Sequence, residues 1–241
     1  MRKIALVPLC LIALTACSKH DPILPGVRSA IFAQDNLNYI NTDVSDLPEN
    51  APVRKASDCP YTQNTTNTVF HNGAKVFMGF PTPNSVKSNQ KPVCTNDSVY
   101  VGLTTGELVK ISQKTNKMVW VADIYKQNNM MGGASIVDIV APIVIDSNHV
   151  YCAGLGNAFC KVATSDGNKK WCIEIGSMHE FIVLKNVAYI VGNDNNLYAV
   201  RTSDGAIYWH APVAENAAPK YENKQIVVGA QKFDASTGTL L

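Results

Sequence analysis

The sequence carries little charge and few of the motifs by which many enzymes are recognised. Only 17% of the residues are charged, and the formal net charge is +2. No stripe of lysine and arginine occurs, so nothing indicates a nucleic-acid partner. No Cys-x-x-Cys motif or Cys/His cluster is present, which argues against a metal site. The five histidines are scattered, and no Ser/His/Asp spacing typical of a hydrolase is recognisable.

A long apolar run is also missing. The stretch Ile4–Ala16 follows a basic start and is too short to remain as a bilayer-spanning helix. It ends in Leu14-Thr15-Ala16-Cys17, which resembles a bacterial lipoprotein signal whose cysteine is lipidated and becomes the mature N-terminus. We therefore predict a signal peptide over residues 1–16 and lipidation at Cys17. The alternative is an ordinary signal peptide with an incidental cysteine.

Three stretches of the chain repeat one pattern in one register. In each, a tyrosine stands 20 residues before a tryptophan and 8 residues before a Leu or Phe. Each copy is about 40 residues long and reads as four short strands bounded by Gly, Asn and Asp, which is typical of propeller blades. A lone blade cannot bury both faces of its sheet, so the aromatic residues are expected to pack blade against blade. They are Tyr100, Leu108 and Trp120, then Tyr151, Phe159 and Trp171, then Tyr189, Leu197 and Trp209.

The repeats predict an all-β fold and set the expected domain boundaries. A fourth copy begins at Pro219, and the chain stops where its tryptophan would stand. We expect an incomplete β-propeller of about four to five blades over residues 69–241, with a docking strand from within 59–91. Residues 17–68 are rich in Asn, Asp, Pro and Thr and are expected to form a flexible, lipid-anchored tether. The expected blades lie near residues 92–124, 142–175, 181–213 and 219–241.

The cysteines leave two interpretations open. Cys10 lies in the predicted signal peptide and Cys17 is the predicted lipid site, so five cysteines remain in a compartment that permits disulfides. Cys152 and Cys160 are expected across one hairpin, near enough for a bridge to be conceivable. Most of the five could equally be small apolar residues within strands.

The blades, with their Tyr, Gly-x-Leu/Phe, Asp-Gly and Trp positions, resemble the PQQ-like repeats of quinoprotein dehydrogenases and of the BamB family of outer-membrane assembly lipoproteins. The order of lipoprotein signal, tether and blades is similar to the BamB family in particular. Two stretches are similar to more specific BamB-family sequences: Leu24–Arg28, and Gly176–Val183 with its acid-Phe pair. The resemblance covers roughly residues 14–30 and 90–241. Family members are larger propellers, so this chain accounts for about half of one ring.

The BamB resemblance implies a scaffold without catalytic activity, cofactor or metal. Such proteins are anchored in the outer membrane and face the periplasm. They bind the barrel-inserting subunit BamA and assist the insertion of outer-membrane proteins. Ser18 fits this location, because an Asp after the lipidated cysteine commonly signals retention in the inner membrane. Unfolded outer-membrane proteins, possible clients for strand addition, and outer-membrane lipid are further implied partners.

The resemblance also implies where BamA is contacted. Family members use inter-blade loops, one with an acidic Asp-x-Asp before a blade-opening proline. The matching stretch, Val137–Pro142, keeps one acid, and Asp138 becomes a candidate for a charge contact. A second family loop carries Leu-x-Leu-Arg, and Val86 and Lys87 are the candidates there. The alternative for Asp138 is a loop acid in solvent.

The sequence leaves two other functions open. A remnant PQQ-dependent dehydrogenase would need a quinone, a calcium site, a catalytic Asp and commonly an adjacent cysteine pair. No Cys-Cys pair occurs, and Asp166, Asp204 and Asp234 stand where turn chemistry explains them. The other alternative is a lipid-anchored propeller that binds another envelope protein or a polysaccharide.

Overall fold

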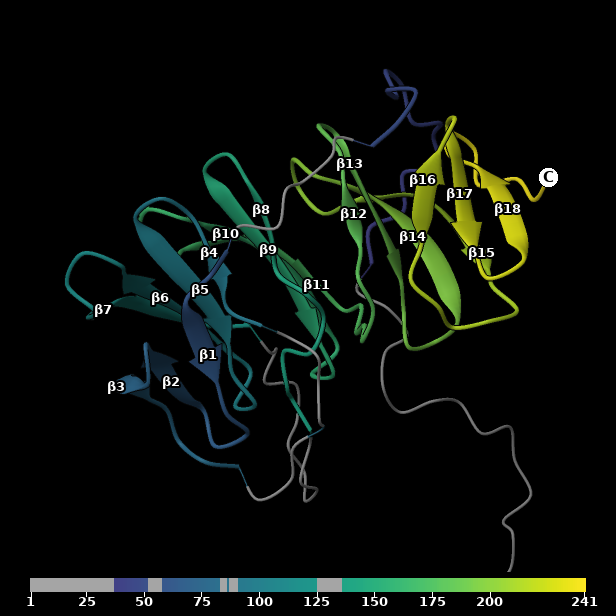
Figure 1. Cartoon of the computed structure of the whole chain (residues 1–241). Helices are drawn as coiled ribbons and strands as arrows, with labels where there is room; N and C mark the ends of the chain where they lie inside the picture. The colour runs from purple at the N-terminus through teal and green to yellow at the C-terminus, as the bar shows by residue number, and fades with distance from the viewer. Residues whose placement is uncertain (1–36, 52–57, 83–85, 87–90, 125–135) are drawn as a thin grey trace, which may run out of the picture. The chain divides into compact units, whose positions relative to one another are not determined.

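The computed structural model describes residues 37–51, 58–82, 86, 91–124 and 136–241. All the regular elements in these ranges are β-strands, arranged in antiparallel sheets whose strand order follows the chain (Figure 1). Three sheets are four-stranded: β4 (Val93–Cys94), β5 (Ser98–Gly102), β6 (Glu107–Ser112) and β7 (Met118–Asp123); β8 (Val144–Asp146), β9 (His149–Gly154), β10 (Ala158–Ala163) and β11 (Lys169–Ile173); β12 (Ile182–Val183), β13 (Val187–Val191), β14 (Asn196–Arg201) and β15 (Ile207–Pro212).

Two further sheets are three-stranded. They comprise β1 (Tyr61–Gln63), β2 (Thr68–His71) and β3 (Ala74–Met78) near the start, and β16 (Lys220–Glu222), β17 (Gln225–Val228) and β18 (Gln231–Asp234) at the end. No buried cluster of the described residues joins the first sheet to the last, so the blades do not close into a ring. The prediction of an all-β, incomplete propeller is confirmed.

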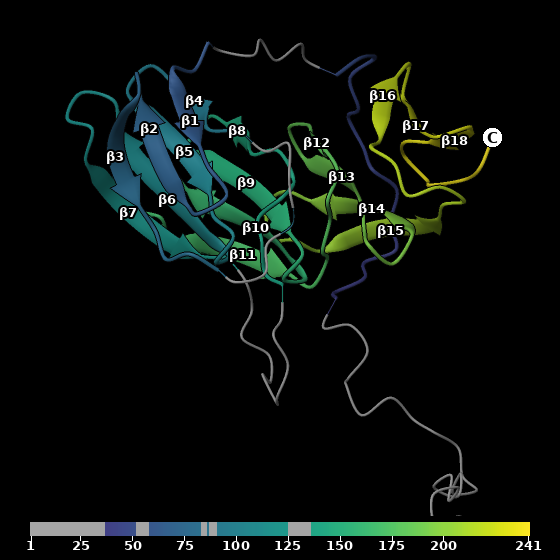
Figure 2. The ribbon, with the colours of Figure 1, turned by 60° about the horizontal axis from the view of Figure 1, so that its bottom comes forward.

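Each sheet packs on its neighbour in the chain, as Figure 2 shows for β12–β15 and β16–β18. One buried cluster joins the first two sheets through Tyr61 and Val99, and the next joins Tyr100 to Val150. The third joins Tyr151 to Ile190, and the fourth joins Tyr189 to Phe233. The hydrophobic core is therefore a series of interfaces between adjacent blades, as expected of a repeat architecture.

The repeated tryptophans pack on the turn glycines of the following blade. A Cβ built on Gly167 would lie 2.9 Å from Trp120 Cδ2, and one on Gly205 would lie 3.1 Å from Trp171 Cδ2. These glycines also have positive φ values, 76° and 80°, which L side chains rarely adopt. The Asp-Gly turn thus serves both the reversal of the chain and the stacking of blades.

Polar bonds repeat at the same junctions. Lys110 Nζ and Trp120 Nε1 both donate to the carbonyl of Thr164, at 2.8 and 3.1 Å. One blade later, Lys161 and Trp171 donate to the carbonyl of Thr202 at the same two distances.

The junction between the sheets β12–β15 and β16–β18 is different. Ala199 stands at the position of these lysines, and the Tyr189 hydroxyl donates to the Ala235 carbonyl at 2.7 Å. Trp209 Nε1 is buried there without a partner among the described residues.

The structure differs from the expected tether in two places. The sheet β1–β3 begins at Tyr61, before the expected boundary at residue 69, and it supplies three strands where one docking strand was expected. Residues 37–51 lie on the last two sheets: Val44 N donates to Ser236 O at 2.9 Å, and Lys224 N donates to Glu49 O at 3.2 Å. Packing against residues far along the chain therefore orders these parts of the expected tether. The signal peptide, Cys17 and the tether up to residue 36 lie outside the described residues.

The disulfides also differ from the bridge considered from the sequence. Cys160 is bonded to Cys172, Cys59 is bonded to Cys94, and Cys152 is buried and free. Cys160 pairs in register with both Cys152 and Cys172. The Cys160–Cys172 Cα separation of 4.2 Å matches a non-hydrogen-bonded pair, in which side chains lie closest. This explains why the bridge forms toward β11 and not toward β9.

Candidate functional site

The loop that leads into β8 is held by backbone bonds to two hairpin turns. Ile139 N donates to Leu103 O at 3.1 Å, and Asp138 O accepts from Leu155 N at 2.9 Å. Gly154 makes this close approach possible, because a Cβ there would lie 2.2 Å from Asp138 O. The loop is therefore fixed between the β5–β6 turn and the β9–β10 turn.

The same arrangement recurs one blade later. Ser177 N donates to Gly154 O at 3.2 Å, and Asn193 N donates to Gly176 O at 2.8 Å. At the following junction, Asn216 Nδ2 donates to Gly192 O at 3.0 Å. These loops and hairpin turns together form one end of the blades, which we call the loop face. It comprises the inter-blade loops at Asp138–Ile139, Gly176–Ser177 and Asn216 and the turns at Leu103, Gly154–Leu155 and Gly192–Asn193.

The structure brings two of the sequence-predicted residues together on the loop face. Val86 N donates to Asp138 Oδ2 at 2.7 Å, although 52 residues separate them. Asp138 is only 1% exposed, so the interpretation of a loop acid in solvent is wrong. Its Oδ1 is buried without a hydrogen-bond partner in the described part of the chain. Lys87 lies outside that part, and a contact of Asp138, Val86 or Lys87 with a partner stays a prediction.

Burial raises the pKa of Asp138 above its ordinary value of 3.8, and the bond from Val86 N partly opposes this. The folded protein therefore holds the proton more readily than the unfolded chain. It follows that the contribution of Asp138 to the free energy of unfolding falls as pH rises from 3.8 through the folded pKa.

Asp138→Asn should remove this pH dependence. The variant should gain stability relative to the wild type as pH rises from 3.8 toward neutrality, as measured by urea midpoints across that range. Asp43→Asn, which removes an exposed carboxylate, is the control. A constant difference between Asp138→Asn and the wild type across the range would contradict the effect of burial.

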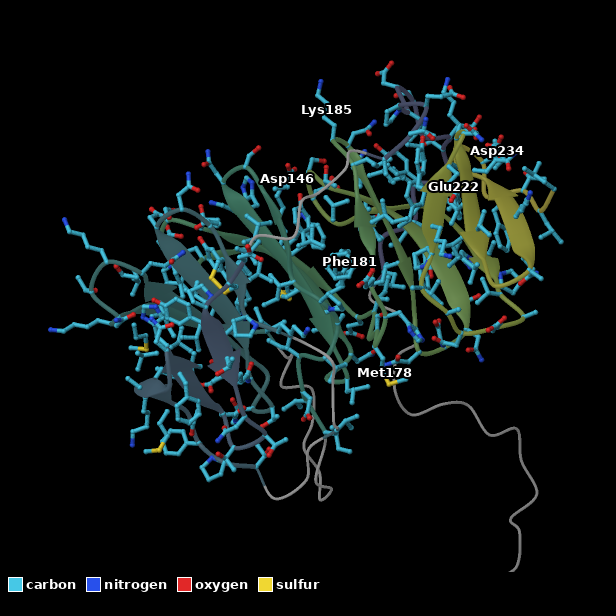
Figure 3. All side chains as sticks on the ribbon, in the orientation of Figure 1. Asp146, Met178, Phe181, Lys185, Glu222 and Asp234 are labelled. Atoms are coloured by element: carbon cyan, nitrogen blue, oxygen red, sulfur yellow. A yellow bond between two sulfur atoms is a disulfide. The ribbon has the colours of Figure 1, made fainter. Side chains whose placement is uncertain are left out.

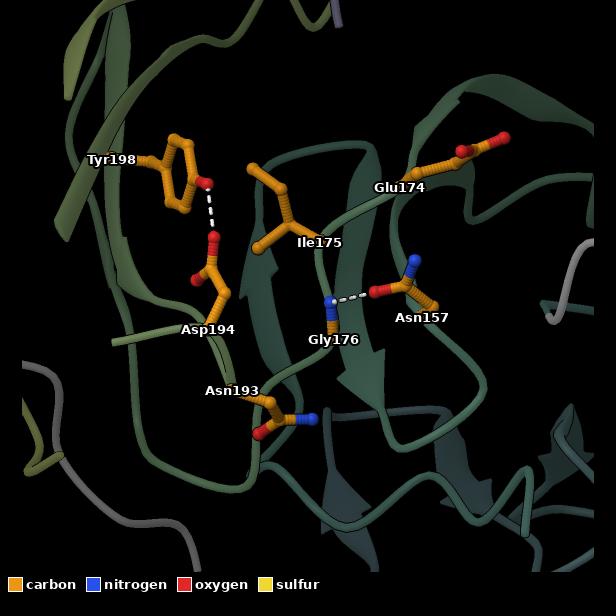
Figure 4. Close-up of a pocket in the computed structure, with 7 residues that line it drawn as sticks. All are labelled: Asn157, Glu174, Ile175, Gly176, Asn193, Asp194 and Tyr198. Carbon is orange, nitrogen blue, oxygen red and sulfur yellow. Dashed lines mark hydrogen bonds between the residues drawn. The ribbon is translucent and has the colours of Figure 1, made fainter. Parts of the chain in front are cut away.

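The loop face contains a small pocket that sequence reasoning missed. It has a volume of about 140 Å³ and lies between the loop after β11 and the β13–β14 turn (Figure 4). Asp194 Oδ2 accepts from the Tyr198 hydroxyl at 2.5 Å, and Gly176 N donates to Asn157 Oδ1 at 3.1 Å. With two carboxylates and two amides, this lining suits a basic or amide side chain. The lining residues are Asn157, Glu174, Ile175, Gly176, Asn193, Asp194 and Tyr198.

Exposed apolar side chains accompany the polar residues on the loop face. They include Ile136, Met178 and Val86, each on a loop between strands of different sheets. Phe181, from the acid-Phe pair noted in the sequence, is instead buried, with its ring centroid 5.0 Å from that of Phe159. Phe181 therefore anchors the loop, while Glu180 and Met178 are presented to solvent.

The described residues include no cluster of three or more His, Cys, Asp or Glu side chains that could hold a metal ion. They also form no helix with the length and hydropathy needed to span a bilayer.

Comparisons with known proteins identify the repeat. The sequence model described as "Outer membrane protein assembly factor BamB" matches residues 70–211. The protein of that name from Legionella pneumophila (strain Paris) is 22% identical over 124 residues, which are 52% of this chain and 32% of the relative. The protein of the same name from Moranella endobia (strain PCIT) is 21% identical over 146 residues, which are 60% of this chain and 38% of the relative. The chain thus spans about a third of the length of these curated relatives.

A solved structure supports the same fold. BamB from Moraxella catarrhalis superposes with a TM-score of 0.60 at 17% identity, over 75% of this chain and 59% of that one. At this identity, the structural likeness shows the fold alone. The sequence match over more than half of the chain goes further and shows that this protein belongs to the BamB family of outer membrane protein assembly factors.

Proposed function

We propose that this protein is a periplasmic scaffold of the β-barrel assembly machinery, anchored in the outer membrane by lipid on Cys17. It binds the barrel-inserting subunit and assists the insertion of outer-membrane proteins. Family membership supports this role. The observation that carries the proposal is the bond between Val86 and Asp138, which joins the two loops implied by the BamB resemblance.

The loop face offers chemistry suited to such a partner. Met178 and Val86 supply exposed apolar area, while Glu174 and Asp194 line a pocket that suits a basic side chain. Asp138 acts by positioning, because its carboxylate holds the backbone at Val86 in place. Charged groups at a contact steer association, and apolar side chains supply the buried area.

A pull-down tests the scaffold role. The chain, tagged at its C-terminus, is purified in mild detergent from native envelopes, and the recovered proteins are identified by mass spectrometry. We expect the wild type to recover the inserting subunit and Lys87→Glu to recover roughly a tenth as much, because it reverses the charge of a predicted contact.

Lys185→Glu is the matched control. It makes the same charge change at the opposite end of the β12–β15 sheet, where Figure 3 shows Lys185 far from Met178. It should recover as much of the subunit as the wild type does. If the folded wild-type chain recovers no inserting subunit, the proposal is contradicted. That result would favour a propeller that binds another envelope component.

A further inference from the structure

The outer strands of the three four-stranded blades can be aligned on their tryptophans. Two residues before each tryptophan stand Met118 in β7, Lys169 in β11 and Ile207 in β15. One residue before each stand Val119, Lys170 and Tyr208. Each strand lies at the edge of its sheet, so the same backbone edge can be compared three times.

The edge of β15 already receives an extended segment of the chain. Ile207 N donates to Asn38 O at 2.8 Å, Ile40 N donates to Ile207 O at 2.9 Å, and Tyr39 forms a parallel bridge with Ile207. Leu37 and Tyr39 pack on the core of that blade. This edge therefore accepts a strand that carries aliphatic and aromatic side chains.

The edge of β11 is protected by charge. Lys169 and Lys170 occupy the two positions before Trp171, and both are exposed. Lysine on an edge strand opposes pairing with another chain, because its charge would have to be desolvated.

The outer edge of β7 has neither protection at these positions, and its one charged residue, Asp123, lies at the far end of the strand. Met118 and Val119 are each 50% exposed, and Val121 is 39% exposed. No lysine or proline lies within β7, and no described segment pairs with its outer edge. An exposed apolar edge strand is a template for the addition of another strand.

We propose that the outer edge of β7 binds, by strand addition, an extended segment of an unfolded β-barrel protein. This inference rests on the proposed function and names the place where a client is held. Barrel strands alternate apolar and polar side chains, so one face of such a strand extends the apolar row of Met118, Val119 and Val121. Lys114 and Lys117, exposed in the turn that enters β7, favour a segment with an acidic end.

The probe is a fluorescent peptide of about ten residues, the length of one barrel strand, with Leu and Tyr alternating with Thr and Gln and an Asp at one end. A peptide of the same composition with its apolar residues in one block is the comparison. Anisotropy should show the alternating peptide binding the full chain more tightly than the blocked one. M118K/V119K, which copies the lysine pair of β11, should weaken this binding about tenfold or more.

Leu240→Lys is the control, because it places a lysine at an exposed apolar position outside both β7 and the loop face. It should bind the alternating peptide as the wild type does. Equal binding of the two peptides by the wild type, or unchanged binding by a folded M118K/V119K, would overturn the inference. The inference would also be overturned if the wild type were a dimer, M118K/V119K were a monomer, and neither peptide were bound selectively. The partner of the β7 edge would then be a second copy of this chain.

The inference and the proposed function can fail separately. M118K/V119K should still recover the inserting subunit in the pull-down, since β7 is not part of the loop face. If the wild type recovers the subunit normally but does not distinguish the two peptides, the β7 proposal alone is overturned. If the wild type binds the alternating peptide selectively but recovers no subunit, the scaffold role is overturned and the β7 proposal is retained.

Discussion

Gly154→Ala should lower the free energy of unfolding by about 3 kcal/mol or more. The added Cβ would lie 2.2 Å from Asp138 O and 2.9 Å from Ile139 Cα. Both are backbone atoms, so no side-chain rotation can relieve the contact. The loop must move away, which breaks the bond from Leu155 N to Asp138 O. Urea unfolding followed by circular dichroism measures the loss, and recovery of the inserting subunit should fall with it.

Gly73→Ala is the control for this prediction. Gly73 has a φ of 80°, but a Cβ there would meet no atom within 4 Å. The substitution should cost about 1 kcal/mol, from backbone strain without a clash. If Gly154→Ala were no more destabilising than Gly73→Ala, the close approach of the Asp138 loop would be contradicted.

Val44→Asp should destabilise the protein by about 3–5 kcal/mol. Val44 is 3% exposed and packs in a cluster with Leu184 and Tyr189. A carboxylate there would be buried among apolar side chains without a counter-ion. The midpoint of urea unfolding should shift accordingly, and the melting temperature should fall.

Thr42→Asp is the matched control, because it adds the same charge at an exposed position two residues away. It should leave stability nearly unchanged. Equal stabilities for Val44→Asp and Thr42→Asp would mean that residues 37–51 are detached from the blades, as expected for a flexible tether.

The blades could be predicted from the sequence because their determinants are local and repeated. Tyr151 and Trp171, for example, recur with fixed spacing in two other copies, and the structure buries both. Residues 37–51 carry no such period. Their burial depends on contacts with Ile207 and Ser236, more than 150 positions along the chain, so their composition predicted a tether.

The candidate site was only partly predictable for a related reason. The resemblance pointed to the loops of Val86 and Asp138, and the structure brings these loops together. The close approach of the Asp138 backbone to Gly154, a residue 16 positions along the chain, is not revealed by a single sequence. The disulfide partner of Cys160 likewise depends on the hydrogen-bond phase of two strand pairs and not on chain proximity.

The junction at Trp209 has a mechanical consequence. The first two four-stranded blades are each tied to the next by a lysine and a tryptophan on one carbonyl, whereas the third is tied by the Tyr189 hydroxyl. Residues 37–51 cross this same joint, bonded to Ile207 on one side and to Ser236 on the other. In a linear array, each unit is held only by its neighbours. Tension applied at the N-terminus therefore enters the array at the joint between its last two sheets, which the crossing segment braces, and not at its first blade.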